Sequence, residues 1–224
     1  AYPCYCTDTE LALIRKLQIA SSRPPRYPGT CRYLNTQERQ KKLAQGSKPS
    51  LRFMVPKRKY IEFHDLVKGK QKFFSDDMGD FIICRQDGSS SFMFSNALDD
   101  SLMKVSHVIR GEDHLTNTPR QLMILEALKL DPPQYGHLPL IHGADGAPLS
   151  KRNGSRSIHE LRELGFLPLA LVNYLARLGH YYESTHFMDW ESLAKNFRLA
   201  HLGKSAAKYN EAQLKYWQKQ AVLG

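Results

Sequence analysis

The sequence predicts a mixed α/β fold that gives way to a helical region. Up to about residue 91, short helical patterns alternate with short strand patterns. A short apolar strand pattern then covers residues 105–111 and is followed by a helix start, and from Ser157 onward apolar residues recur at three- and four-residue spacing. With 224 residues and 42% hydrophobic content, the chain is long enough for one large domain or two small ones with a buried core.

The first helix should follow residue 6, where Thr7 and Glu10 have the spacing of a capping box. We expect its apolar face to consist of Leu13, Ile14 and Leu17. Residues 23–31, RPPRYPGTC, form a Pro/Gly loop that should return the chain toward the first cysteines, and a second helix is predicted over residues 36–46.

Strand patterns dominate the rest of this first section. Residues 80–88 followed by 92–98 are interpreted as strand, turn and strand. Two further strands are indicated by apolar residues that alternate with their neighbours: Leu51, Phe53 and Val55, and Ile61 and Phe63.

The next section should contain a buried strand over residues 105–111 and a helix that begins at Thr118, with its hydroxyl as cap and Pro119 in the first turn. Asp131-Pro-Pro ends that helix region, and residues 137–141 resemble another strand. Four helices are predicted beyond Ser157, in SIHELRELGF, PLALVNYLARLGH, MDWESLAKNF and EAQLKYWQKQ.

The charge balance favours a polyanionic partner. The 32 Lys and Arg residues exceed the 22 Asp and Glu residues, which gives a net charge of +10, and basic residues bind phosphates with release of counterions. Plain solubility charge is the alternative. Clustering favours nucleic acid, and the clusters are Lys41-Lys42, Lys57-Arg58-Lys59, residues 68–72 and Lys151-Arg152.

Several classes of protein are excluded by pattern. No apolar run approaches the length of a membrane span, and the N-terminal AYPCYCTDTE lacks the regions of a secretory signal, so we expect a cytoplasmic protein. None of the nine histidines has a spacing to Ser or Cys that indicates a hydrolase; His107, His114 and His137 are expected to serve packing or nucleotide contacts. Phe73 and Phe74 could stack on unpaired bases, but we favour a place in the sheet core.

Cysteines occur at positions 4, 6, 31 and 84. A long chain without a secretory signal makes disulfides improbable, and three cysteines near the start indicate a metal site that lacks a fourth ligand. Three buried thiols that hold a loop are the alternative. Cys84, in a predicted strand, is interpreted as a core residue.

Two segments carry a family resemblance: residues 107–120, HVIRGEDHLTNTPR, and Leu149-Ser150-Lys151-Arg152 after a strand and a Gly-rich turn. Together with Tyr135-x-His137 and the helix GFLPLALVNYLARLG, they resemble the glutamyl-tRNA synthetases of class I, in which the second segment is the KMSKS-type loop. The resemblance runs in order and spacing from Tyr5 to about Trp217. No His-x-Gly-His motif is present.

The resemblance implies a substrate site. Lys151 would act as the catalytic cation that stabilises the triphosphate as pyrophosphate leaves. Arg110 would contact substrate glutamate through its guanidinium fork, although an ion pair with Glu112 or Asp113 is the alternative. Phe92 and Asn96 would line the amino-acid pocket, and ATP contacts are implied at Asp113, Ile141, Leu149, Ser150, Lys151 and Arg152, with Mg²⁺ accompanying ATP.

Two departures from the family pattern point to weakened turnover. Pro148 replaces the first Lys of the loop motif, which removes a cation and fixes φ at the loop entrance. Phe92 stands where the family usually has Tyr, and the missing hydroxyl could cost about 1 kcal/mol of substrate binding.

The resemblance also implies the metal. Cys4, Cys6 and Cys31 match the zinc knuckle of the acceptor-stem domain in many family members. In related glutamyl-Q synthetases a Tyr four positions before the last Cys completes the site, and Tyr27 matches it. We therefore expect zinc bound by Cys4, Cys6, Tyr27 and Cys31.

The fold implied is α/β: the second half of a Rossmann-type catalytic domain with an inserted α+β acceptor-stem domain and a C-terminal helical stem-contact region. The expected boundaries are 1–91 for the acceptor-stem domain, 92–146 for the Rossmann half and 147–224 for the loop and helices. We expect the other Rossmann half before Ala1 and an anticodon-binding region after Gly224, and therefore an inactive chain when it is alone.

The implied function is ATP-dependent ligation of L-glutamate to tRNA(Glu) through glutamyl-adenylate, by a monomer. A glutamyl-Q synthetase paralogue is one alternative, although the helices after Ser157 argue against it. A catalytically incomplete tRNA-binding fragment is the other.

Overall fold

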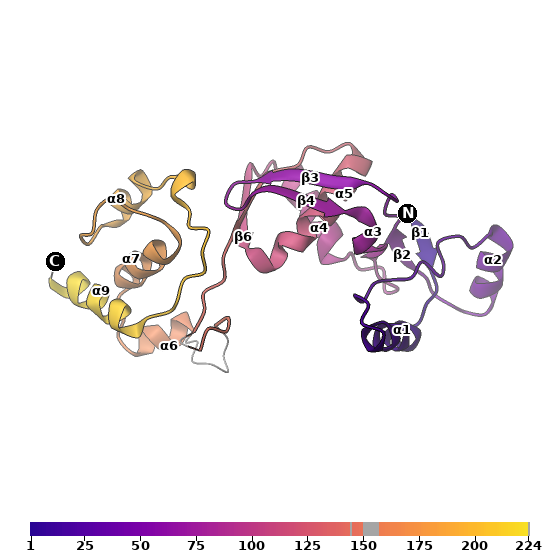
Figure 1. Ribbon diagram of the computed structural model, residues 1–224, viewed down its shortest axis with the longest axis horizontal. Helices are drawn as coiled ribbons and strands as arrows, with labels where there is room; N and C mark the ends of the chain where they lie inside the picture. Colours follow the sequence, from indigo (N-terminus) through magenta and orange to yellow (C-terminus); the bar gives the residue numbers. More distant parts are fainter. Residues whose placement is uncertain (144, 150–156, 224) are drawn as a thin grey trace. The chain divides into compact units, whose positions relative to one another are not determined.

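The computed structural model describes residues 1–143, 145–149 and 157–223 (Figure 1). The chain forms two compact units, each assembled from several segments. Unit 1 comprises Ala1–Phe63, Lys70–Ser106 and Thr116–Pro133, and unit 2 comprises His64–Gly69, His107–Leu115 and Gln134–Gly224. The two units are described in turn.

Unit 1 contains a three-stranded antiparallel sheet with the order β1-β2-β5. Its strands are β1 (Tyr2–Cys4), β2 (Ser50–Phe53) and β5 (Phe81–Cys84). Tyr2 pairs with Arg52, and Leu51 pairs with Cys84. Strand β2 alternates as predicted, but the predicted apolar face is wrong: Ser50 and Arg52 are buried, while Leu51 is exposed. Cys84 is half-buried in its strand.

Helix α1 (Asp8–Ala20) begins at the predicted capping box, in which both hydrogen bonds between Thr7 and Glu10 are present. Of the predicted apolar face, Ile14 is half-buried, but the prediction is wrong for Leu13 and Leu17. Leu13 and Leu17 are 58% and 60% exposed, whereas Leu11 packs against the core cluster around Tyr2. The residues that turn inward recur at 11, 14 and 18, so the helix is rotated relative to the expected face.

A second helix and a hairpin follow. Helix α2 (Thr36–Ala44) is capped by Asn35 and Glu38, two residues shorter than predicted. Strands β3 (Tyr60–Asp65) and β4 (Gly69–Phe74) lead into the short helix α3 (Ser75–Met78). Phe73 stacks on Phe63 at 6.1 Å and Phe74 packs on Tyr60 at 5.0 Å, so both phenylalanines lie within the sheet, but they are half-buried rather than in a core.

Residues 92–98, predicted as a strand, instead begin helix α4 (Phe92–Leu102). The apolar spacing of this short segment fits either periodicity. Packing decides between them, because α4 packs against α5 (Thr118–Leu128) and its Ala97 is fully buried. Helix α5 has Pro119 in its first turn as predicted, but Asn117 rather than Thr118 occupies the cap position.

Unit 2 is built around parallel strand pairing. Strand β6 (His107–Gly111) pairs along its length with β7 (Gln134–Leu138), which also meets Asp65 of β3 at Tyr135. The strand order is β4-β3-β7-β6. Strand β6 was expected to be buried but is partly exposed at the end of this order, and β7 starts three residues before the predicted strand. The 3₁₀ helix η1 (Glu112–Asn117) follows β6.

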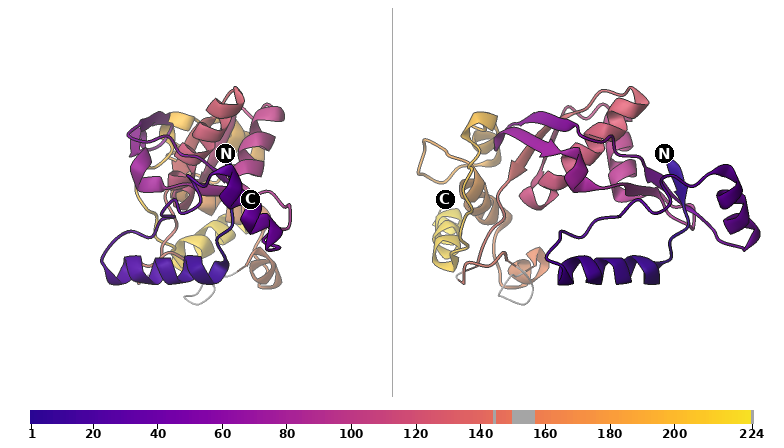
Figure 2. Two further views of the ribbon diagram at one scale, coloured as in Figure 1. Left: turned by 90° about the vertical axis from the view of Figure 1, so that its right-hand side faces the viewer. Right: turned by 45° about the vertical axis from the view of Figure 1, so that its right-hand side comes forward.

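The rest of unit 2 is helical, as predicted. Helix α7 (Pro168–Gly179) packs against α9 (Glu211–Leu223), and both are drawn in the orange-to-yellow part of Figure 2. The core cluster of these helices includes Tyr174, Leu214 and Trp217. Ser157 forms the capping box of α6, with Glu160 as its partner. The helices are α6 (Ile158–Glu163), α7 (Pro168–Gly179), α8 (Trp190–Lys195) and α9 (Glu211–Leu223), with the 3₁₀ helix η3 (Leu199–His201) between the last two.

Across the described parts of the chain, no helix combines the length and the hydropathy that crossing a membrane requires.

Candidate functional site

Arg110 lies near the C-terminal end of β6, directly opposite His137 in the parallel register of β6 and β7. Its Nε donates a hydrogen bond to His137 Nε2 at 3.1 Å, and its guanidinium lies 5.3 Å from the centre of the Tyr135 ring. Ligands of α/β sheets bind beyond the carboxyl ends of parallel strands. The side chain therefore occupies the end of the sheet where a substrate contact is expected.

Behind this pair lies a fully buried carboxylate, Asp65, which the sequence did not single out. Its Oδ2 lies 2.5 Å from His137 Nδ1, and its Oδ1 accepts hydrogen bonds from the backbone N–H groups of Val67, Lys68 and His137. Burial acts to raise the pKa of Asp65, but hydrogen bonds from Lys68, His137 and Val67 outweigh it and hold the pKa below its usual range.

The two contacts of His137 fix its proton. Burial lowers the pKa of His137 despite the neighbouring Asp65, which favours the neutral ring. The carboxylate of Asp65 requires a proton on Nδ1, which leaves the lone pair of Nε2 to accept from Arg110. Two hydrogen bonds thus connect the side chains of Asp65, His137 and Arg110, and we call this chain the relay. Through the histidine ring, the buried carboxylate orients the guanidinium.

Two of the predicted ATP contacts lie just after the ends of these strands, and a third, Leu149, is hydrogen-bonded to one of them. Asp113 is in η1, directly after β6, and its carboxylate lies 3.6 Å from His114 Nε2. Ile141 follows β7, and its carbonyl accepts a hydrogen bond from Leu149 N at 2.8 Å. The turn between Ile141 and Leu149 includes Gly146 at φ +77°, which a side chain would strain.

The remaining loop residues, Ser150, Lys151 and Arg152, lie outside the described residues. Glu112 forms an ion pair with Lys68 at 2.5 Å. The hydrogen bond from Lys68 is the main reason that the pKa of Glu112 lies below its usual range.

Phe92 and Asn96 lie in unit 1, one helical turn apart on α4, so that they share a face. Phe92 is 47% exposed. Asn96 Oδ1 accepts a hydrogen bond from Nε2 of the fully buried Gln121 on α5 at 2.6 Å. Because its oxygen faces Gln121, the amide of Asn96 is held in a defined orientation.

Unit 1 also brings the three predicted metal-binding cysteines together. The Sγ atoms of Cys4, Cys6 and Cys31 all lie within 4.8 Å of one another, and all three residues are buried. Cys6 Sγ and Cys31 Sγ are 3.7 Å apart. Two thiolates on a tetrahedral zinc ion, at about 2.3 Å each, would be about 3.8 Å apart. The cluster has the size of a zinc site.

Tyr27 completes this group. Its hydroxyl oxygen lies 3.4 Å from Cys4 Sγ and 3.7 Å from Cys6 Sγ, and it accepts a hydrogen bond from Cys31 N at 2.8 Å. Oxygen and sulfur ligands of one tetrahedral zinc ion would be about 3.5 Å apart. The Pro/Gly loop therefore returns to the cysteines as predicted, and the residues present fit a zinc ion.

The pKa values of two thiols in the cluster shift in opposite directions. Burial raises the pKa of Cys6 to about 12. Burial also acts on Cys4, but hydrogen bonds from Tyr27 and Arg52 outweigh it and lower the pKa of that thiol. Arg52, which the sequence did not single out, therefore favours a thiolate in this cluster.

One predicted basic segment pairs with an aromatic ring in the structure. Lys72 Nζ lies 4.1 Å from the centre of the Tyr60 ring and 2.9 Å from Glu62. Both Lys72 and Tyr60 are exposed, so this strand face combines charge and an aromatic surface, as RNA-binding surfaces do.

Comparison with known proteins gives a family match over most of the chain. The model of "tRNA synthetases class I (E and Q), catalytic domain" matches residues 1–216. "Glutamate--tRNA ligase 2" of Coxiella burnetii (strain RSA 331) is 60% identical over 222 residues, 99% of this chain and 48% of that protein. "Glutamate--tRNA ligase 1" of Methylococcus capsulatus is 54% identical over 224 residues, 100% of this chain and 48% of that protein.

Two solved structures are similar to this chain over nearly its whole length. A glutamate tRNA ligase from Elizabethkingia meningosepticum, crystallised in complex with its amino acid, matches 99% of this chain and 49% of its own, with a TM-score of 0.88 and 27% identity. The glutamate-tRNA synthetase of Elizabethkingia anophelis gives a TM-score of 0.89 at 27% identity, over 99% of this chain and 50% of its own. The chain spans about half the length of these relatives.

Proposed function

The chain belongs to the class I tRNA synthetases (E and Q), and from this premise we propose that it contributes to the ligation of L-glutamate to tRNA(Glu). In the first step the carboxylate of glutamate attacks the α-phosphate of ATP, which forms glutamyl-adenylate and releases pyrophosphate. In the second step the terminal ribose hydroxyl of tRNA attacks the acyl carbon and releases AMP. Mg²⁺ accompanies ATP and offsets phosphate charge.

The observation that carries the proposal is the relay behind Arg110. A guanidinium whose Nε is engaged by a neutral His137 keeps its Nη groups in a fixed plane, suited to a bidentate contact with a carboxylate. The buried Asp65 maintains the required proton on His137. Glutamate, with two carboxylates, is a substrate that such a group recognises, and a solved relative carries its amino acid.

The other site residues take roles in keeping with the family. Phe92 and Asn96 on α4 would line the amino-acid pocket, with Asn96 oriented by Gln121. Asp113, Ile141 and Leu149 would contact ATP together with Ser150, Lys151 and Arg152 of the loop. Lys151 would stabilise the negative charge that develops on the leaving pyrophosphate.

We also propose the domain roles and partners. Residues 1–91 would hold the tRNA acceptor stem around a zinc ion bound by Cys4, Cys6, Tyr27 and Cys31, residues 92–146 would form half of the Rossmann-type catalytic domain, and residues 147–224 would contribute the loop and the stem-contact helices. The net charge of +10 supports a tRNA partner. We propose a cytoplasmic monomer.

Glutamate-dependent exchange of labelled pyrophosphate into ATP, in the presence of tRNA, tests this function on the full-length protein. We expect exchange with glutamate and none with aspartate or glutamine. Lys151→Ala should lower the exchange rate by roughly a hundredfold or more, as for the loss of a group that stabilises transition-state charge. The alternative, a tRNA-binding fragment without catalysis, predicts tRNA binding in the absence of any exchange.

A further inference from the structure

Arg52 is a buried cation without a carboxylate partner in the part of the chain that the structure describes. It is only 5% exposed, and none of the ion pairs there includes it. Asp80 accepts a hydrogen bond from Arg52 Nη1 through its backbone oxygen, at 3.2 Å. The carboxylate of Asp80 is already engaged by Tyr2, Arg32 and Val55.

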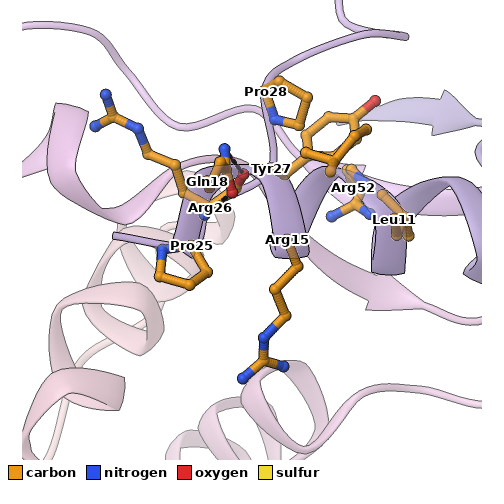
Figure 3. Close-up of a pocket in the computed structure, with 9 residues that line it drawn as sticks. Leu11, Arg15, Gln18, Pro25, Arg26, Tyr27, Pro28 and Arg52 are labelled. Atoms are coloured by element: carbon orange, nitrogen blue, oxygen red, sulfur yellow. Dashed lines mark hydrogen bonds between the residues drawn. The ribbon is translucent and has the colours of Figure 1, made fainter. Parts of the chain in front are cut away.

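A buried, unpaired charge is costly, so the fold must supply an anion near it. The cysteine cluster lies close to Arg52. Its guanidinium lies 3.7 Å from the centre of the Tyr27 ring, and the two side chains are drawn together in Figure 3. The cation therefore faces Tyr27, one of the four proposed zinc ligands, and the strand that carries it, β2, pairs with β1, which carries Cys4.

The charge of a loaded site explains this arrangement. A zinc ion with three thiolates and one phenolate carries a net charge of −2, and such a charge is expensive in a buried position. Arg52 would reduce it by one. The planar guanidinium can also stack on the ring of Tyr27 and hold its oxygen toward the sulfur atoms, which a lysine ammonium cannot do in the same way.

We propose that Arg52 is the positioning residue and counter-charge of the zinc site, and that it acts without coordinating the metal. This inference rests on the zinc site of the proposed function. It adds a residue from β2, 21 positions beyond the last cysteine ligand, to a site otherwise formed by the first 31 residues.

Zinc affinity tests the inference directly, by competition with a chromophoric chelator on the purified chain. Arg52→Met removes the charge and preserves much of the side-chain volume, and it should weaken zinc binding by roughly 10- to 100-fold, the usual effect of losing a group that supports metal ligands. Arg15→Met is the matched control, because Arg15 lines the same surface pocket of about 480 Å³ but is exposed. Its zinc affinity should equal that of the parent.

Cobalt(II) substitution distinguishes a residue that positions the metal ligands from a residue that coordinates the metal. The thiolate-to-cobalt absorption of Arg52→Met at saturating metal should match the parent, whereas Cys4→Ser should lower it. If Arg52→Met does not fold, as judged by circular dichroism, Arg52→Gln replaces it, with the same expected loss of affinity.

Two contrary results have different meanings. Parent-like zinc affinity in the folded Arg52 variants would overturn the role of Arg52 and leave the zinc site intact. A parent chain that takes up no zinc after refolding with the metal would instead overturn the zinc site itself, and with it this inference.

Discussion

Removal of the Asp65 carboxylate should destabilise unit 2 more than any exposed substitution. Asp65→Ala leaves four donors without their acceptor: the N–H groups of Val67, Lys68 and His137, and the ring Nδ1 of His137. Lys68 is partly exposed, so its N–H can turn to water. Three buried donors at about 1–2 kcal/mol each, without full additivity, predict a loss of about 3–5 kcal/mol.

Urea denaturation followed by circular dichroism measures this loss. Glu183→Ala provides a matched control, since it removes an exposed carboxylate of the same unit and should change the free energy of unfolding by less than about 0.5 kcal/mol. A loss below about 1 kcal/mol for Asp65→Ala would refute the reasoning. ¹⁵N NMR of the parent should also find the His137 proton on Nδ1, and a proton on Nε2 alone would contradict the relay.

Other parts of the chain give three further predictions. The pKa of Asp65 is lowered in the folded state, so the stability that its carboxylate contributes should be complete above about pH 5 and be lost as the pH falls through the folded pKa. A difference in the free energy of unfolding between the parent and Asp65→Ala that is the same at about pH 2 as at about pH 7 would contradict this. Leu214→Ala, at a fully buried position between α7 and α9, should cost about 2–5 kcal/mol in urea denaturation, and a cost below 1 kcal/mol would mean that the core is elsewhere. Ser157→Ala removes one half of the α6 capping box and should cost about 1 kcal/mol, whereas an equal loss from Thr185→Ala, at an exposed position, would show that the cap is not responsible.

Features that depend on nearby residues could be predicted from the sequence. The capping box at Thr7 was predicted from residues three apart, and the helix predicted from Ser157 also begins where expected. The cysteine cluster was predicted because two of its members are separated by one residue and a Pro/Gly loop returns the chain to them.

Features that depend on packing could not be predicted in the same way. The segment from Phe92 has apolar residues that suit a strand or a helix, and contact with α5 selects the helix. On α1, Leu13 and Leu17 have the spacing of a buried face, yet the chain buries the side that includes Leu11. Local periodicity does not determine which of several apolar faces turns inward.

The residues that the sequence missed are charged and far from their partners. Asp65 meets His137 across 72 positions, and Arg52 meets Tyr27 across 25 positions. An isolated Asp or Arg is normally a surface residue, so only the tertiary structure reveals that these two are buried. Arg110 and His137 could have been paired from sequence if the parallel register of β6 and β7 had been known.

The central claim is that Arg110, held by Asp65 and His137, binds the substrate glutamate. It is tested most directly by measuring how aminoacylation by the Arg110→Lys variant of the full-length protein depends on glutamate concentration. A lysine keeps the charge but loses the fork and the Nε–H that His137 holds. We predict that KM for glutamate rises by roughly tenfold or more, as for the loss of a charged hydrogen bond, while KM for ATP stays near that of the parent. An unchanged KM for glutamate would contradict the claim that the relay of Asp65, His137 and Arg110 holds the substrate.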